Sequence, residues 1–271
     1  MKWGQVFCGV AAAFALAGCA SVATSPRAGI AEGVYPAPLL DQTAAQPEDK
    51  ERKARIDLAL AYLELGRVDV ALDEIAKARA LNPSDPLVPY AWGLAHLALG
   101  DRATAEKSLE EAQRLAPNDP DILHALGSLR CSGDRFQEGL ALLREAAMNP
   151  YYPRRARSLA NHAWCAWRAG DESAVQNEID MALALQPDDF LVQVRALQWA
   201  ARKRQWAIAD RHLERLLLRA PDDPMVWWLA ANLAHAKGDR LNEARWAERL
   251  RQEAPNRLET RKLERGEWES W

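Results

Sequence analysis

Cysteine and histidine are the side chains of this sequence best suited to bind a metal ion, act as a nucleophile or carry a covalent group. The 271-residue chain has four cysteines and five histidines. The histidines are scattered along the chain, at His96, His124, His162, His212 and His235. The sequence contains no G-x-S-x-G, H-E-x-x-H, phosphate-binding-loop or C-x-x-C pattern. We therefore expect no enzyme activity, no metal site and no cofactor other than a covalent lipid.

The covalent group is predicted at Cys19. Lys2 precedes an uncharged run of about twelve residues, too short for the roughly twenty that span a bilayer but typical of a signal peptide core. The run ends in Leu16-Ala17-Gly18-Cys19, which resembles the lipobox of bacterial lipoprotein signals. In those signals the cysteine thiol takes a diacylglyceryl group, and the chain is cut before it. We expect residues 1–18 to be a signal peptide and Cys19 to be lipidated. The alternative is a plain signal peptide cut nearby, with Cys19 a free thiol.

Lipidation of Cys19 would place the protein on a membrane, because one acyl chain holds only marginally and several hold stably. Ala20 follows, where an Asp would retain a Gram-negative lipoprotein at the inner membrane. The similarity to these signals thus implies the periplasmic face of the outer membrane. Residues 19–50 are rich in small residues and proline and lack any helical or strand period. They are predicted to form a flexible tether.

Regularly spaced prolines reveal an internal repeat in residues 51–271. These prolines are Pro83, Pro117, Pro187, Pro221 and Pro255. They are 34, 70, 34 and 34 residues apart, and 70 is two periods of 34 plus two residues. Thirty-four residues is the period of the tetratricopeptide repeat (TPR), a helix–turn–helix unit. The register predicts six repeats and a C-terminal capping helix, at residues 52–85, 86–119, 120–153, 156–189, 190–223, 224–257 and 258–271.

Other positions of the register support this interpretation. Position 27 is alanine in the first four repeats, and position 24 is an apolar residue in all six. Small residues allow helices to pack closely. Glycine suits the left-handed turn that ends the first helix, and five repeats carry one there: Gly66, Gly100, Gly133, Gly170 and Gly238. The sequence therefore predicts an all-α fold, a right-handed superhelical solenoid of six TPR repeats.

A partner-binding groove is predicted on the inner face, which the first helix of each repeat lines in such a solenoid. Positions 5, 9, 12 and 13 point inward, and the groove candidates among them are Ile56, Leu60, Leu63, Leu94, Leu97, Trp164, Trp167 and Trp228. An apolar groove suits a peptide or a helix, and tryptophan is a frequent binding hot spot. For each tryptophan, packing between helices is the alternative. With a net charge of −3, the chain is not expected to bind nucleic acid. Alone, the protein is expected to be a monomer.

Cys131 and Cys165 lie in successive repeats, and two states are open to them. A disulfide requires Cα atoms within about 7 Å, whereas equivalent sites on stacked helices lie about 10 Å apart. We expect two buried free thiols.

The junction between the third and fourth repeats resembles the type IV pilus biogenesis/stability proteins PilF and PilW. Residues 151–170 match that family's Tyr-Pro-x-x-(Ala/Ser)-Arg followed by Asn-x-(Gly/Ala), and the two-residue insertion falls in the same place. His162 and Ala163 depart from the family, which has Leu and Gly there.

This resemblance covers the mature chain and implies a pilotin. Such an outer-membrane lipoprotein binds a secretin subunit and supports its localisation and assembly for type IV pili. In family terms the first repeats hold the secretin, which favours Leu60, Leu63, Leu94 and Leu97. The alternative is a TPR lipoprotein scaffold that recruits peptidoglycan enzymes.

Overall fold

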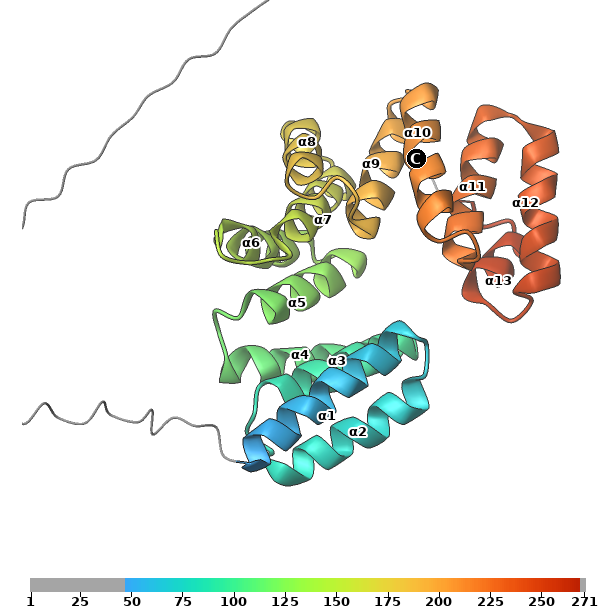
Figure 1. Cartoon of the computed structure of the whole chain (residues 1–271). Coiled ribbons are helices and arrows are strands. Elements are labelled where there is room, and N and C mark those ends of the chain that lie inside the picture. The colour runs from blue at the N-terminus through green and yellow to red at the C-terminus, as the bar shows by residue number, and fades with distance from the viewer. Residues whose placement is uncertain (1–46, 269–271) are drawn as a thin grey trace, which may run out of the picture. The chain divides into compact units, whose positions relative to one another are not determined.

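The computed structural model describes residues 47–268, and every regular element in that range is an α-helix. Twelve of these helices form six antiparallel pairs, and the thirteenth follows at the C-terminal end (Figure 1). The helices are α1 (Pro47–Glu64), α2 (Val68–Leu81), α3 (Leu87–Ala98), α4 (Arg102–Leu115), α5 (Pro120–Ser132), α6 (Phe136–Met148), α7 (Arg155–Arg168), α8 (Val175–Leu185), α9 (Phe190–Arg202), α10 (Trp206–Arg219), α11 (Pro224–Lys237), α12 (Arg240–Glu253) and α13 (Leu258–Glu264).

The predicted signal peptide, Cys19 and most of the predicted tether lie outside the described residues. Helix α1 begins at Pro47, so residues 47–50 are helical and do not belong to a tether. Within residues 47–268, no helix combines the length and the apolar character needed to cross a membrane.

Glycines allow the two helices of a repeat to pack closely. A Cβ on Gly93 of α3 would lie 2.8 Å from Leu109 Cγ of α4, and one on Gly127 of α5 would lie 2.9 Å from Leu143 Cγ of α6. Real Cβ atoms do not approach that closely, so each glycine makes room for the fully buried leucine opposite. The pattern of small residues therefore sets the distance between paired helices.

A residue in the left-handed conformation follows the end of each first helix, at position 15 of all six repeats. These residues are Gly66, Gly100, Asp134, Gly170, Arg204 and Gly238, with φ of 70°, 80°, 64°, 86°, 55° and 73°. The expectation for Gly133 is wrong, since its φ is −108° and Asp134 takes the left-handed role. Aspartate tolerates this region because its short polar side chain can bond locally.

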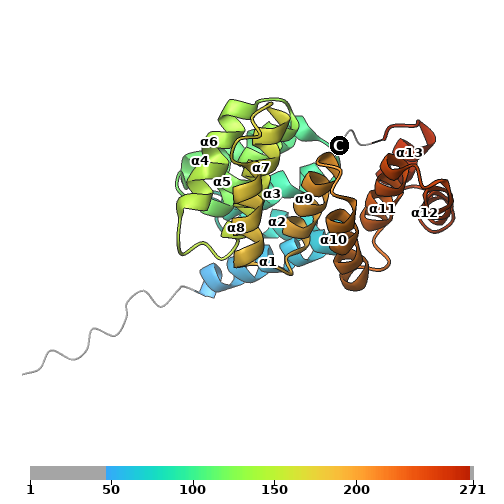
Figure 2. The same ribbon diagram turned by 90° about the horizontal axis from the view of Figure 1, so that it is seen from above.

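Successive pairs stack so that first helices contact first helices, α1 with α3, α5 with α7, and α7 with α9. Seen from above in Figure 2, the pairs turn relative to one another, which is the superhelical arrangement of a TPR array. The core lies between helices of the same and of adjacent pairs, and Leu60 contacts the apolar clusters of both the first and second repeats.

Cys131 and Cys165 form a disulfide, so the expectation of two free thiols is wrong. Their Cα atoms are 5.5 Å apart, within the range that a disulfide bridges. About 10 Å separates the axes of packed helices, but Cα atoms lie about 2.3 Å out from each axis. Facing Cα atoms at a crossing are therefore much closer than the axes, and α5 and α7 cross at this point.

Candidate protein-binding groove

A groove of about 910 Å³, open to solvent, crosses the first helices of the second to fifth repeats. Its apolar lining includes Tyr90, Leu94, Leu97, Leu129 and Trp164. Leu94 and Leu97 are three residues apart on α3 and therefore share one helix face. The structure thus brings together three of the residues predicted from sequence, Leu94, Leu97 and Trp164.

Basic side chains complete the lining. Among the described residues, Arg154, Arg157 and Arg195 line the groove, together with polar groups but no aspartate or glutamate. Arg154 pairs with Asp121 at 2.6 Å and Arg157 with Asp189 at 2.7 Å, and neither carboxylate is among the residues that line the groove. The groove therefore combines apolar walls with positively charged guanidinium groups.

A chain of hydrogen bonds connects three first helices along the groove. Asn161 of α7 donates from Nδ2 to Ser128 Oγ of α5 at 2.9 Å, and accepts at Oδ1 from Arg195 Nε of α9 at 2.9 Å. A second guanidinium nitrogen of Arg195 donates to Gln198 Oε1 at 2.8 Å. These bonds hold the guanidinium of Arg195 4.0 Å from the centre of the Trp164 ring, a cation–π contact. Both the cation and the ring are thereby pre-positioned for a ligand.

Burial keeps the other ionisable groups of the groove uncharged. It lowers the pKa of His124 to about 4, and the ring Nδ1 lies 2.9 Å from Ser158 Oγ. It also raises the pKa of Tyr90 to about 12. At neutral pH the charges of the lining are therefore those of the arginines, which suit a ligand with acidic and apolar side chains.

The remaining predicted groove residues lie elsewhere. Ile56 is 1% exposed in the core of the first two repeats, which Leu60 and Leu63 also contact. Trp167 packs between repeats, with its ring 6.2 Å from that of Trp199. Trp228 is 4% exposed beneath the C-terminal residues. Of the described residues predicted for the groove, these five do not line it.

Sequence reasoning missed the three arginines as groove residues. Two of them stood in the junction that carried the family resemblance, as Arg154 and Arg157 of Tyr152-Pro153-Arg154-Arg155-Ala156-Arg157. Tyr152 of the same motif is buried and donates its hydroxyl to Asp121 at 2.6 Å. The junction therefore builds one edge of the groove, which its pattern alone did not reveal.

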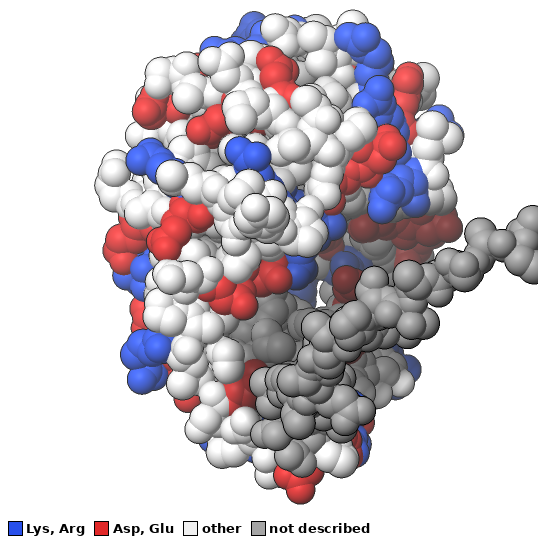
Figure 3. Space-filling model, turned by 60° about the vertical axis from the view of Figure 1, so that its left-hand side comes forward, with Lys and Arg blue, Asp and Glu red and all other residues white. Residues whose placement is uncertain are grey.

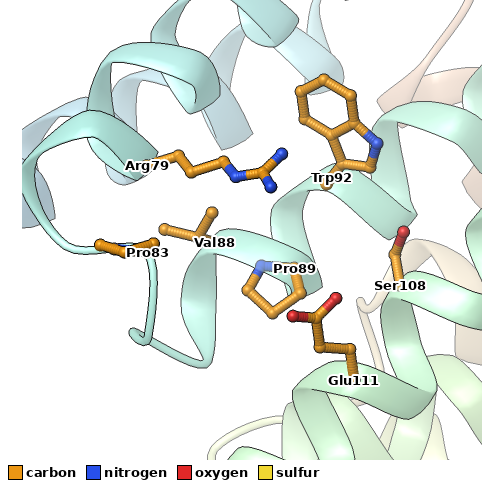
Figure 4. Close-up of a pocket in the computed structure, with 7 residues that line it drawn as sticks. All are labelled: Arg79, Pro83, Val88, Pro89, Trp92, Ser108 and Glu111. Atoms are coloured by element: carbon orange, nitrogen blue, oxygen red, sulfur yellow. The ribbon is translucent and has the colours of Figure 1, made fainter.

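A second cleft of about 480 Å³ lies near α2, α3 and α4. Figure 4 shows Arg79 and Glu111 pointing into it, with Val88 and Pro89 between them. Both charged residues are largely exposed and opposite in sign, so the cleft favours neither anions nor cations. Figure 3 likewise shows acidic and basic side chains interspersed over one face of the molecule. Within residues 47–268, His, Cys, Asp and Glu side chains form no group of three suited to a metal ion.

Residues 37–86 and 90–153 match the family model of the tetratricopeptide repeat. The described residues have the all-α superhelical fold of tetratricopeptide repeats. A TPR array is a fold for binding protein partners on its concave face, and the matched model describes no catalytic domain. No curated protein sequence matches the chain.

The solved structures that share the fold of this chain include PilF, PilW and a TPR protein of Thermus thermophilus. PilF of Pseudomonas aeruginosa is 20% identical with a TM-score of 0.57, over 82% of this chain and 100% of its own. PilW, a type IV pilus biogenesis factor, is 19% identical with a TM-score of 0.59, over 78% and 97%. A thermophilic TPR protein of Thermus thermophilus is 20% identical with a TM-score of 0.58, over 68% and 98%. At these identities the likeness is one of fold.

Proposed function

We propose that this TPR protein is an outer-membrane lipoprotein of the periplasmic face that binds a secretin subunit and supports its localisation and assembly for type IV pilus biogenesis. The observation that carries the proposal is the junction of residues 151–170. Its sequence resembles the PilF and PilW family, and its residues Arg154 and Arg157 line one edge of the groove. The correspondence of fold over 100% of the PilF chain and 97% of the PilW chain supports the same assignment.

Two parts of the chain have separate roles in this function, Cys19 and the groove. Acyl chains on Cys19 anchor the protein, because several buried chains together bind a bilayer stably. The groove binds the secretin, with Leu94, Leu97 and Trp164 contacting apolar side chains of the partner. The arginines attract acidic side chains and speed the encounter, as complementary charges do.

Deletion of the gene tests the function. We expect secretin multimers to disappear from the outer-membrane fraction and pilus-dependent twitching motility to be lost. Wild-type protein should restore both, and a Leu94→Lys, Leu97→Lys variant should not, because it places two charges in the apolar wall. Leu218→Lys is the matched control, since Leu218 is largely exposed outside the groove.

Normal multimers in the deletion strain would overturn the proposal. Normal multimers together with altered peptidoglycan synthesis would instead favour the scaffold for cell-envelope enzymes.

The anchor is tested separately by Cys19→Ala. This variant should leave the membrane fraction and appear in the soluble periplasm with an unchanged circular dichroism spectrum. A variant that still fractionates with the outer membrane would refute lipidation of Cys19.

A further inference from the structure

The C-terminal residues return to the last repeat and place Trp268 against α11. The indole of Trp268 is parallel to the imidazole of His235, with ring centres 4.1 Å apart and planes at 4°. It is equally parallel to the indole of Trp228, with centres 5.7 Å apart and planes at 6°. The planes of the three rings are therefore nearly parallel.

Trp268 lies between the other two rings. Trp228 and His235 are seven residues apart on one helix, which separates them by about 10.5 Å along its axis. The two centre-to-centre distances to Trp268 together span nearly that length. Helix α11 thus holds two ring walls with room for one flat ring between them, and we call this space the aromatic slot.

The aromatic slot is the counterpart of the groove wall in another repeat. Trp228 and His235 occupy positions 5 and 12 of the sixth repeat, and Tyr90 and Leu97 occupy the same positions of the second. Tyr90 and Leu97 line the open groove, whereas Trp268 covers the equivalent surface on α11. The chain's own tryptophan therefore sits where a ligand would contact the inner face.

Trp268 fills the aromatic slot but leaves two buried nitrogen atoms of its walls without hydrogen bonds. Trp228 Nε1 and His235 Nδ1 are buried and make no hydrogen bond within the described chain. The imidazole nitrogen lies 3.2 Å from Glu243 Oε2, but outside hydrogen-bond geometry. A buried indole N–H without a partner is costly, so a ligand with both an aromatic ring and a hydrogen-bond acceptor would satisfy the slot better than Trp268 does.

We propose that the aromatic slot of α11 is a second protein-binding site, which takes an aromatic side chain of a partner protein in place of Trp268. In the unbound protein Trp268 occupies the slot and shields Trp228 from water. The partner's ring replaces it between Trp228 and His235, while a neighbouring carbonyl or carboxylate of the partner accepts from the indole of Trp228. The charged groups near the slot include Lys262, 6.0 Å from the Trp228 ring, and Glu243. Arg240, Glu248 and Arg251 line the surface beside Trp268. This site is separate from the groove and does not depend on the identity of the groove's partner.

In the first experiment the full chain carries Trp268→Ala, and the missing indole ring is added on a separate peptide. The probe is an acetylated peptide of residues 262–268, and its matched control has alanine in place of the tryptophan. We expect the probe to bind the variant at least about tenfold more tightly than the wild type, since Trp268 competes in the latter. The added substitution Trp228→Ala should abolish this binding. Equal affinities for wild type and variant would overturn the proposal.

The second experiment uses the wild-type chain, which avoids any folding defect of the variants. Hydrogen–deuterium exchange of residues 258–268 is measured with and without saturating N-acetyl-tryptophanamide. Displacement of Trp268 should raise deuterium uptake in this segment at least about threefold, with no change in α3 or α5. Unchanged uptake would show that Trp268 is a permanent cap of the last repeat and would also overturn the proposal.

Discussion

Cys131 and Cys165 are bonded to each other directly beneath the groove, in a buried cluster against which Trp164 packs. The bond joins α5 of the third repeat to α7 of the fourth, across the point where the two-residue insertion interrupts the regular period. It therefore fixes the two helices that carry Ser128 and Asn161, and with them the hydrogen-bonded chain that positions Arg195.

Removal of this disulfide should destabilise the fold. The bond closes a loop of 34 residues, for which the loss of unfolded-state entropy predicts a stabilisation of about 3–4 kcal/mol. We expect urea denaturation of Cys131→Ala, Cys165→Ala to show a decrease of that size in the free energy of unfolding. Dithiothreitol should lower the stability of the wild type and leave the double variant unchanged. A double variant as stable as the oxidised wild type would contradict the bond.

The left-handed residue Arg204 offers a stabilising substitution. A side chain at a φ of 55° is strained, whereas glycine adopts that conformation freely. Arg204→Gly should raise the free energy of unfolding by about 0.5–1 kcal/mol, after allowance for the greater entropy of glycine in the unfolded chain.

Gly100→Ala is the matched control for Arg204→Gly. Gly100 has a φ of 80°, and a Cβ there would meet no atom within 4 Å, so the substitution adds only backbone strain. It should lower the stability by about 1 kcal/mol. Thermal denaturation of both variants checks the pair, and changes of the same sign would contradict the assignment of position 15.

The partly buried His124 makes stability depend on pH. Burial lowers its pKa from 6.5 to about 4 in the folded chain, so the unfolded chain binds the proton more readily. The stability due to neutral His124 is fully present above about pH 6.5 and is lost as the pH falls towards 4. At pH 5 the loss is about 2 kcal/mol.

His124→Gln should flatten the pH dependence of stability between pH 6.5 and 4, as measured by urea denaturation at several pH values. His212 is partly buried too and has its pKa lowered to about 4, so part of the dependence should remain in the variant. An identical pH profile for wild type and His124→Gln would show that the ring is protonated or exposed in the folded chain.

Tyr151 and Tyr152 are adjacent in the junction but differ in burial, so only substitution of Tyr152 should affect stability. Tyr152 is 5% exposed and donates its hydroxyl to the carboxylate of Asp121, while the adjacent Tyr151 is 90% exposed. Tyr152→Phe leaves the carboxylate without this donor and should cost about 1–2 kcal/mol of stability. Tyr151→Phe should change the melting temperature by less than the measurement error. Equal effects of the two substitutions would contradict the hydrogen bond.

Much of the fold could be predicted from the sequence because its determinants are local and periodic. The proline spacing, the small residues such as Gly93 opposite Leu109, and the turn before each second helix recur every 34 residues. The apolar positions of a helix follow from the 3.6-residue period, so the inward-facing positions were also within reach. That is why the sequence alone could indicate that Leu94, Leu97 and Trp164 face the inner side of the array.

The tertiary structure alone decided which inward-facing residues remain open to a partner. Ile56 and Trp228 share the register position of Tyr90. Tyr90 lines the groove, whereas Ile56 lies in the core of the first two repeats and Trp228 lies against Trp268. The sequence likewise could not predict the close approach of two helices that allows Cys131 to bond to Cys165. Nor could it predict that three arginines line one groove. A helical period specifies the direction of a side chain from its own axis. What covers that side chain depends on residues brought near by the packing of other helices, and their distance along the chain leaves no local signal.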